Sequence, residues 1–496
     1  MGSRKINKRT FLKQSAITVS GLAILPSLNF SGFDVPETLL KRRLGKTNRE
    51  VTTFGLGGQA SIQWTPDDVD PVAIILKAFK LGINYFDTSN LYGPSQMNYG
   101  KAFRQLDLIP GNSAYNEKLR KSIFLTSKTH LRYAKGNLDI PGLNNWTNGE
   151  QGSHTIDDIK RTLSQVFGDG NGNYPKGAYL DMVLLHSITS QPDVDAVLEG
   201  LDNPDPKAKQ IGALAALLDY RDGTNKTGLN PKEEKLIKHL GFSGHWNAGV
   251  MMQLIRRDHQ NILDGMLVAI NANDKLNLNM QNNVIPVAKA KDMGVIGMKT
   301  FADGAMYTKE ATWSNNPSHV VRKVGSPEMS YSDLIQYSLT TPGVDTLIIG
   351  IGQISDNPEE CQLTKNIAAA QIKPNGLSHA QRASIEKIAA KVKDGKTNYF
   401  QEAKGGLTAA QNIITEKIES NKIILSWDTA YAGDDPINLY KIFKNDELVG
   451  EVVHSPQISE KKFSLVDVLN PDSKSVYKIV TVDKAKNWVS SELISI

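Results

Sequence analysis

Four residues that can exchange protons stand at or just after short apolar runs of the sequence: Asp87, Tyr92, Lys128 and His186. Reduction of a carbonyl needs a proton at oxygen as hydride reaches carbon, and an ordinary phenol, with a pKa of about 10, holds its proton too tightly to respond well near neutrality. A lysine ammonium beside the tyrosine stabilises the phenolate, and a carboxylate beside the lysine keeps that ammonium charged and in place. A histidine can hydrogen-bond the substrate oxygen and orient it. Together these residue types predict an acid–base device for carbonyl and alcohol chemistry.

Each of these residues also has a structural explanation when taken alone. An Asp–Lys pair is usually a salt bridge, a tyrosine usually belongs to the core, and a histidine after an apolar run is more often a satisfied buried residue than a catalyst. The four together, at the ends of successive strand-like runs, favour the catalytic interpretation. In a parallel barrel, functional side chains lie where the strands end and the loops open.

The runs that carry these residues belong to a longer alternation of strand-like and helix-like segments. Apolar residues at helical spacing lie between the runs, for example in 72–79 and in 156–167, where Ser153 is the expected N-cap. Eight such units predict a (β/α)8 TIM barrel rather than an open doubly wound sheet. The eight predicted strands are 51–56, 83–86, 123–126, 182–185, 240–243, 266–270, 295–298 and 346–349.

The chain divides into four predicted parts. Residues 1–35 form a leader, residues 39–372 the α/β barrel, and residues 373–411 a lysine-rich helical extension and linker that leads away from the barrel. Residues 412–496 contain short strand-like runs separated by turn residues at sandwich-like intervals. This C-terminal part resembles a fibronectin type III module, which is an all-β sandwich.

Two further features suggest how these parts are used. Polar, turn-rich insertions, several of which follow strands, predict a walled substrate site at the barrel mouth, with surface loops of no special role as the alternative. They span 139–152, 169–177, 221–232 and 303–327. In the C-terminal part, Trp427, Tyr440 and Tyr477 are predicted to pack in the core, with a sugar-binding aromatic face as the alternative.

Charge and cysteine content narrow the classes of function. The net charge of +5 is equal to the charge of the first 30 residues, which hold five basic residues and no acidic one, so the rest of the chain is neutral overall and no nucleic-acid partner is predicted. Cys361 is the only cysteine, which excludes an intramolecular disulfide and a cysteine-ligated cluster, and no metal site is predicted. No interior apolar run approaches the roughly 20 residues of a spanning helix, so the mature protein is predicted to lack a membrane span.

The N-terminus has the order of an export signal. A basic stretch precedes a short apolar segment, 16–25, which ends at Pro26. The segment 7–13 resembles a twin-arginine signal, although Lys8 stands where the first arginine should be. The resemblance implies export of the folded protein to the periplasm. The alternative is an amphipathic N-terminal helix that stays on the protein.

Several segments resemble, in order, the recurrent motifs of the aldo-keto reductase family. They are 41–47, 55–58, 86–93, the lysine strand 124–128, 181–186 and 239–245, and the resemblance covers residues 39–370. The family resemblance implies that Tyr92 is the general acid or base, that Lys128 and Asp87 tune it, and that His186 orients the carbonyl. It also implies a small-molecule carbonyl or alcohol as substrate.

The same resemblance implies a nicotinamide cofactor, NADP or NAD. Gly244 and Met298 depart from the family pattern, which usually has asparagine after the serine and a tyrosine that stacks on nicotinamide. Acidic residues near the eighth strand, without an arginine among them, weaken the attraction for a 2′-phosphate, so NADP is preferred only slightly over NAD. The implied cofactor contacts are Gly57, Gly58, Ser243, Asn271, Met298, Lys299, Gly350, Gly352, Gln362 and Asn366.

Two functions remain open at this point. The first is an exported oxidoreductase for a carbonyl or sugar-derived substrate, which retains its cofactor because free nicotinamide nucleotide is scarce outside the cytoplasm. The second is a cofactor-binding regulatory or sensor protein on the same scaffold, with the C-terminal domain as the surface for a protein partner. Tyr92→Phe separates them, since only the enzyme should lose catalysis with its fold intact.

Overall fold

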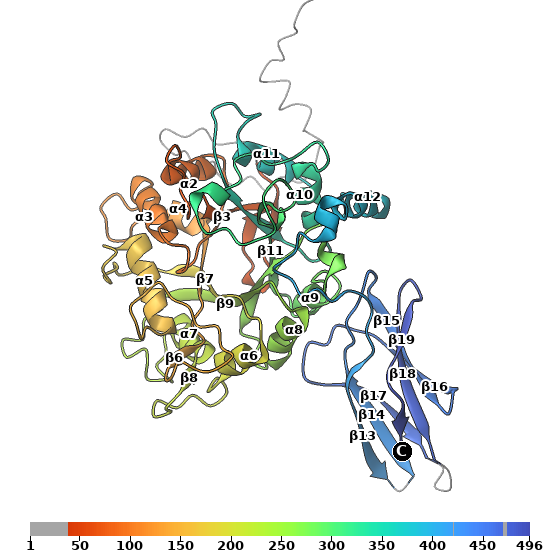
Figure 1. Cartoon of the computed structure of the whole chain (residues 1–496). Helices are drawn as coiled ribbons and strands as arrows, with labels where there is room; N and C mark the ends of the chain where they lie inside the picture. Colours follow the sequence, from red (N-terminus) through yellow and green to blue (C-terminus); the bar gives the residue numbers. More distant parts are fainter. Residues whose placement is uncertain (1–37, 420, 470–473) are drawn as a thin grey trace, which may run out of the picture.

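The computed structural model describes residues 38–419, 421–469 and 474–496. The predicted export leader, residues 1–35, lies outside the described residues. The described chain forms a closed barrel followed by a β-rich C-terminal domain (Figure 1). Within it, no helix combines the length and the apolar character needed to cross a bilayer.

Eight parallel strands close the barrel, which confirms the predicted α/β fold class. All eight predicted runs overlap these strands, and only the first is displaced, because residues 50–52 belong to a separate hairpin. In spatial order the barrel strands are β3 (Phe54–Ala60), β4 (Tyr85–Asp87), β5 (Phe124–Thr129), β7 (Leu180–Leu185), β9 (Ile237–Gly244), β10 (Leu263–Ala269), β11 (Gly294–Met298) and β12 (Thr346–Ile351).

The N-terminal hairpin closes the bottom of the barrel. Strands β1 (Lys41–Arg43) and β2 (Glu50–Thr52) pair in antiparallel fashion. Leu44 and Val51 from this hairpin are buried in one apolar cluster with barrel residues that include Tyr85. Since the bottom is packed with side chains, the barrel is open to ligands only at the carboxyl ends of its strands.

Helices cover the outside of the barrel, and side-chain caps begin some of them. The Asp70 side chain accepts from the N–H of Val72 at the start of α2, and Asn247 accepts from Val250 at the start of α8. The N-cap of α5 is His154 rather than the predicted Ser153. The helices are α2 (Pro71–Lys80), α3 (Ser95–Gln105), α4 (Glu117–Ser122), α5 (Thr155–Phe167), α6 (Gln191–Leu198), α7 (Ala213–Asp222), α8 (Ala248–Arg257), α9 (Val284–Ala290), α10 (Tyr331–Leu339) and α11 (Gln362–Ala369), and the short strands β6 (Tyr133–Lys135) and β8 (Ile211–Gly212) pair outside the barrel.

The segment after the barrel returns to it. Helix α12 (His379–Ala389) is followed by residues 391–402, in which Phe400 and Gln401 are buried. The Asn398 amide exchanges hydrogen bonds of 3.0 and 3.1 Å with Asn271, directly beyond β10. The expectation that 373–411 leads away from the barrel is therefore wrong, because Arg382 of α12 donates to the carbonyl of Tyr337 in α10 and buried amide pairing holds the stretch after α12 against the barrel mouth.

The C-terminal domain consists of two antiparallel sheets around an apolar core. Trp427, Tyr440 and Tyr477 are all fully buried there, which confirms their predicted core role. One sheet has the order β13-β14-β17 and the other β16-β15-β18-β19, with β20 paired to β18. The strands are β13 (Gln411–Glu419), β14 (Lys422–Asp428), β15 (Ile437–Lys444), β16 (Glu447–Val453), β17 (Phe463–Val468), β18 (Val476–Asp483), β19 (Trp488–Ser490) and β20 (Ile494–Ser495).

This domain is attached to the barrel near α8 and α9, where the blue part of Figure 1 meets the green helices. Asn283 accepts from the N–H of Ala432 at 2.8 Å and donates to the carbonyl of the same residue at 3.1 Å. Arg256 of α8 donates to Gln457 at 2.8 Å. Polar contacts to backbone and to a side chain therefore fix the join on the side of the barrel, away from the bottom hairpin.

Candidate active site

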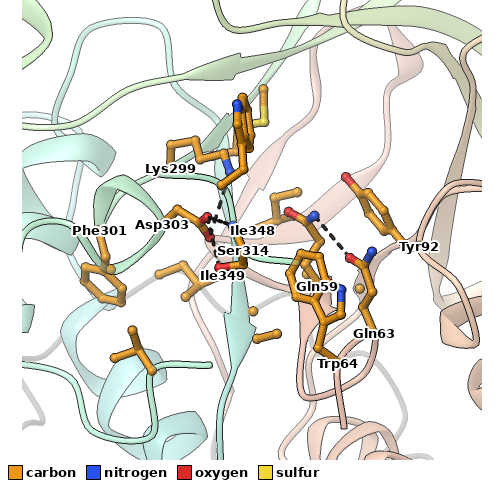
Figure 2. A pocket seen from close by; sticks show the side chains of 18 of the residues that line it. Gln59, Gln63, Trp64, Tyr92, Lys299, Phe301, Asp303, Ser314, Ile348 and Ile349 are labelled. Carbon is orange, nitrogen blue, oxygen red and sulfur yellow. Dashed lines mark hydrogen bonds and ion pairs between the residues drawn. The ribbon is translucent and has the colours of Figure 1, made fainter. Parts of the chain in front are cut away.

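A cavity of about 350 Å³ opens at the carboxyl ends of the barrel strands. Its wall includes Tyr92 and His186 on one side and Met298 and Gly350 from the ends of β11 and β12. Figure 2 shows Tyr92 with Gln63 and Trp64 on one flank and Lys299 with Asp303 on another. This is the end of a parallel barrel at which loops are free to carry functional groups.

Asp87 and Lys128 form a buried ion pair at the base of the cavity. Asp87 is the last residue of β4, Lys128 lies in β5, and Lys128 Nζ is 2.6 Å from Asp87 Oδ2. The same amine donates to the carbonyl of Thr88 at 2.9 Å. Burial raises the pKa of Asp87, against the attraction of Lys128, and burial lowers the pKa of Lys128. The second carboxylate oxygen, Asp87 Oδ1, is buried without a hydrogen bond to any described residue.

Tyr92 lies in the loop after β4, next to this pair. Lys128 Nζ is 4.7 Å from the centroid of the Tyr92 ring, and the ring meets the imidazole of His186 edge-on with centroids 5.7 Å apart. Burial, and then the negative charges of Asp87 and Asp303, raise the pKa of Tyr92 well above its ordinary value. The expected lowering of this pKa by Lys128 is therefore wrong for the structure as it stands, because burial of the phenol, and then the charge of Asp87, favour the protonated form. The phenol carries its proton.

His186 follows β7 and is held from several sides. Its Nδ1 lies 3.2 Å from the hydroxyl of Ser89, and its carbonyl accepts from Arg132 at 2.8 Å. Burial, and then nearby positive charges that begin with Lys128, lower the pKa of His186 well below its ordinary value. The ring is neutral near physiological pH, so it can donate one hydrogen bond and accept another.

The predicted catalytic residues Asp87, Tyr92, Lys128 and His186 thus meet in one place, although they come from three different βα units. Register explains part of this meeting. Asp87 pairs with Thr126 across β4 and β5, and Lys128 pairs with Leu184 across β5 and β7. Strand ends that are adjacent in the barrel place their side chains at one mouth.

Sequence reasoning missed several residues of the cavity wall. His130, two residues after Lys128, donates from Nδ1 to the carbonyl of Asn144 at 2.7 Å, and burial lowers its pKa to about 3. His245, at the end of the motif that contains Ser243, also lines the cavity. Both histidines could have been found by following those two strands a little further.

An aromatic wall at the mouth has no comparable signal in the sequence. Trp313, from the insertion after β11, is 50% exposed and contacts the rings of His245 and Tyr399 edge-on, with centroids 5.6 and 5.3 Å apart. Phe400 from the C-terminal extension packs against the same indole. These residues come from segments far apart in the chain, so only the fold brings them together.

Comparison with known proteins decides the family. The model of the aldo/keto reductase family matches residues 53–388 of this chain. The chain belongs to the aldo/keto reductase family. Most motifs that carried the resemblance in the sequence run along barrel strands and end at the mouth, whereas the N-terminal segment 41–47 lies at the bottom.

Relatives within this family are distant. The uncharacterized oxidoreductase YqkF of Bacillus subtilis is 21% identical over 71% of this chain and 94% of its own length. L-galactose dehydrogenase of Arabidopsis thaliana is 22% identical over 71% of this chain and 95% of its own length. Among solved structures, an aldo-keto reductase from Klebsiella pneumoniae in complex with NADPH is 16% identical, with a TM-score of 0.43, over 71% of this chain and 96% of that one.

The aldo/keto reductase resemblance implied ten cofactor contacts, and these divide into two groups. Gly57, Gly58, Met298, Lys299 and Gly350 line the cavity. Outside its lining lie Ser243, Asn271, Gly352, Gln362 and Asn366.

The second group is largely engaged with other parts of the protein. Ser243 accepts from the N–H of Ser187 at 2.9 Å, and Asn271 pairs with Asn398. The amide of Gln362 accepts from Gly352 at 2.7 Å and donates to the carbonyl of Arg322 at 2.8 Å. A Cβ on Gly352 would lie 2.1 Å from the carbonyl oxygen of Val321, which belongs to the insertion 303–327. Only a glycine at position 352 therefore leaves room for that backbone.

The residues at the cavity fit a dinucleotide in one specific respect: several buried polar atoms lack partners among the described residues. At the cavity they include Asp87 Oδ1 and Thr300 Oγ1, and both amide atoms of Asn366 lack partners outside the cavity lining. A buried polar group without a partner is costly, and a bound polar ligand would remove that cost. A dinucleotide fits better near Asp87 and Thr300 than near Gln362. The Gln362 amide already accepts from Gly352 and donates to Arg322 of the insertion.

Proposed function

We propose that this protein is an NADP- or NAD-dependent oxidoreductase that interconverts a carbonyl and an alcohol, with Tyr92 as its general acid and base. The observation that carries the proposal is the buried Asp87–Lys128 pair, 2.6 Å apart, beneath a phenol that also touches His186. A structural ion pair would not need a tyrosine and a histidine at the wall of an open cavity.

The residues have distinct roles in the proposed reaction. A bound nicotinamide supplies or accepts the hydride. Tyr92, protonated at neutral pH, donates its proton to the carbonyl oxygen, and Lys128 stabilises the phenolate that remains, because the ammonium lies close to the ring. Asp87 is a positioning residue that keeps the lysine charged and in place. Neutral His186 hydrogen-bonds the substrate oxygen and sets its orientation.

We further propose a sugar-derived substrate. The cavity wall combines neutral imidazoles, of His130 and His186, with the half-exposed indole of Trp313. Neutral imidazoles hydrogen-bond hydroxyl groups, and an indole face suits the C–H face of a sugar ring. A relative that acts on L-galactose is consistent with this class.

The same proposal has three further parts. Residues 1–35 direct export to the periplasm, the C-terminal domain is fibronectin type III-like, and that domain binds a protein partner. NADP is slightly preferred over NAD because aldo/keto reductases commonly use NADP. Export agrees with a cofactor that stays bound, and mass spectrometry of nucleotide released from natively purified protein tests this point together with the choice of nucleotide. Cell fractionation tests the export.

Tyr92→Phe tests the central proposal. The variant keeps the ring and its packing but removes the proton, so kcat/KM for a carbonyl and sugar panel should fall by about 10²- to 10⁴-fold. Nucleotide affinity should change little. Tyr115→Phe, outside the cavity lining, is the matched control and should keep its activity. If Tyr92→Phe turns over substrate like the wild type, Tyr92 is not the acid. A wild-type protein that binds the nucleotide but reduces no carbonyl would favour the sensor alternative.

A further inference from the structure

His130 is fixed by one of its ring nitrogens and open at the other. It follows β5, two residues after Lys128, and is 8% exposed at the cavity wall. Its Nδ1 lies 2.7 Å from the carbonyl oxygen of Asn144. A carbonyl oxygen can only accept, so Nδ1 carries the proton of the ring. Nε2 makes no hydrogen bond with a described residue and is not among the sealed polar atoms, so it is open to the cavity.

The ring of His130 is neutral, and its open nitrogen is therefore an acceptor. Burial, and then the charge of Arg132, lower the pKa of His130 to about 3. Near neutrality the ring holds one proton, which is on Nδ1, and Nε2 presents a lone pair without an N–H. A substrate carbonyl, which also only accepts, cannot bond to this nitrogen. A substrate hydroxyl can donate to it.

The insertion 139–152 keeps this proton in place. Asn144 belongs to the insertion, and its side chain donates to the hydroxyl of Thr189 at 2.9 Å. The next residue, Asn145, accepts from the N–H of Arg132 at 2.9 Å. These contacts tie the insertion to the segments that follow β5 and β7. The Asn144 carbonyl is therefore held towards the imidazole, and Nδ1 keeps its proton.

His186, beside this ring, has the opposite pattern. The two imidazoles meet edge-on with centroids 5.4 Å apart. The hydroxyl of Ser89 accepts from the N–H of Leu91 at 3.2 Å. Its oxygen lies 3.2 Å from Nδ1 of His186 and 3.4 Å from Oδ1 of Asn90, so the shorter contact favours donation to the imidazole. When Nδ1 accepts, the proton of the neutral ring is on Nε2, and His186 offers a donor to the substrate.

We propose that His130 and His186 together recognise an α-hydroxycarbonyl: His186 donates to the reacting carbonyl oxygen, and His130 accepts from the hydroxyl on the next carbon. This substrate class deepens the proposed function and rests on it. An open-chain aldose or ketose carries both groups, whereas a simple aldehyde carries only the first. In the reverse direction the same two nitrogens fit a vicinal diol, since each hydroxyl can both donate and accept.

The positions of the two protons can be measured without turnover. Long-range proton–nitrogen correlation spectra of the full chain, with isotope-labelled histidine, distinguish a protonated ring nitrogen from an unprotonated one. The loss of signals in His130→Asn and in His186→Asn assigns the two rings. We expect a proton on Nδ1 and none on Nε2 of His130, and the reverse for His186. A cationic His130, or one protonated at Nε2, would overturn the proposal.

A matched pair of substrates tests the consequence for selectivity. D-glyceraldehyde has a hydroxyl beside its aldehyde, and β-hydroxypropanal lacks that hydroxyl. His130→Asn keeps an N–H near the position of Nδ1 for the Asn144 carbonyl, but has no atom at the position of Nε2. The ratio of kcat/KM for D-glyceraldehyde to that for β-hydroxypropanal should therefore fall by about 10- to 100-fold, because only the first substrate loses a hydrogen bond.

Two further variants bracket this result. The amide oxygen of His130→Gln reaches the position of Nε2, so this variant should recover part of the ratio. His379→Asn makes the same replacement at an exposed histidine outside the cavity lining and should keep the ratio of the wild type. A ratio of two substrates does not depend on the fraction of folded enzyme, so partial unfolding of a variant does not imitate the effect.

The outcomes separate this substrate class from the proposed function. If the wild type reduces both aldehydes and the ratio is unchanged in His130→Asn, the α-hydroxycarbonyl site is wrong and the oxidoreductase remains. If the wild type reduces no carbonyl, the proposed function fails and this site fails with it. If His130→Asn does not fold, the positions of the ring protons in the wild type decide.

Discussion

Two buried ion pairs stand at the same end of the barrel and differ in how completely they are hydrogen-bonded. Asp193 accepts from Arg132 Nε at 3.0 Å, and its other oxygen accepts from the N–H and the hydroxyl of Thr189 at 3.0 Å each. Asp87 uses only one oxygen, on Lys128. Both pairs are removed from water. Only the second leaves an oxygen unused next to a cavity.

This difference agrees with the proposal that the Asp193 pair is structural and that the Asp87 pair takes part in the reaction. Arg132 also donates to the carbonyls of His186 and Ser187, so the Asp193 pair holds the loop that carries His186. A fully bonded pair has no capacity left for a ligand, whereas an incompletely bonded one can respond when charge develops on a neighbour. We therefore expect the two pairs to react differently to substitution.

The largest expected effect follows from Lys128→Met. Removal of the ammonium leaves the Tyr92 phenolate unstabilised, so kcat/KM should fall by about 10²- to 10⁴-fold. The buried carboxylate of Asp87 would also lose its partner, and the double variant Asp87→Asn with Lys128→Met should recover stability without activity, because a neutral buried pair avoids the desolvation cost. If the double variant remained active, the Asp87–Lys128 pair would not be needed for the reaction, and it would not differ in function from the Asp193–Arg132 pair.

Asp193→Asn should have the opposite profile. Arg132 would keep a buried charge without its carboxylate, so the free energy of unfolding should fall by about 3–5 kcal/mol. Activity per folded molecule should change far less than in Lys128→Met, since Asp193 touches neither ligand nor Tyr92. Urea unfolding monitored by circular dichroism measures the first effect, and steady-state kinetics measures the second. Unchanged stability in Asp193→Asn would contradict the structural role.

The buried histidine of the cavity wall gives a smaller, pH-dependent effect. The folded-state pKa of His130, about 3, lies below the value of about 6.5 expected in the unfolded chain, so the unfolded state binds the extra proton between these values. Stability from this group is present above pH 6.5 and is lost towards pH 3, by up to about 1.4 kcal/mol per pH unit.

His130→Gln should flatten that part of the pH profile of the unfolding free energy. The exposed His379→Gln is its control and should leave the profile of the wild type in place. An identical slope in His130→Gln and wild type would show that other groups govern the acid sensitivity.

The smallest effect is expected for an exposed ion pair of the C-terminal domain. Lys441 and Glu451 are opposite each other in β15 and β16, 3.3 Å apart and 38% and 44% exposed. Water and salt screen this pair, so Lys441→Gln should cost less than about 1 kcal/mol in thermal or urea unfolding. A loss comparable with that of Asp193→Asn would mean that burial does not distinguish these ion pairs.

The four catalytic candidates and the barrel were accessible from the sequence, whereas the surroundings of the site were not. Lys128 and His186 could be found because each ends a short apolar run, and a parallel barrel places all such ends at one mouth. The aromatic wall could not be found. Phe400 lies in a lysine-rich stretch whose local pattern indicated a linker, and it is buried close in the chain to Asn398, which pairs with Asn271.

By itself the sequence determined which segments form strands, that the strands alternate with helices, and which residues stand at the strand ends, because those properties depend on neighbours along the chain. The tertiary structure alone decided the pKa directions of Tyr92 and His186 and the return of the C-terminal extension to the mouth. It also decided which of the implied cofactor residues face the cavity. Burial and charge depend on contacts between distant segments, and those contacts exist only once the chain has folded.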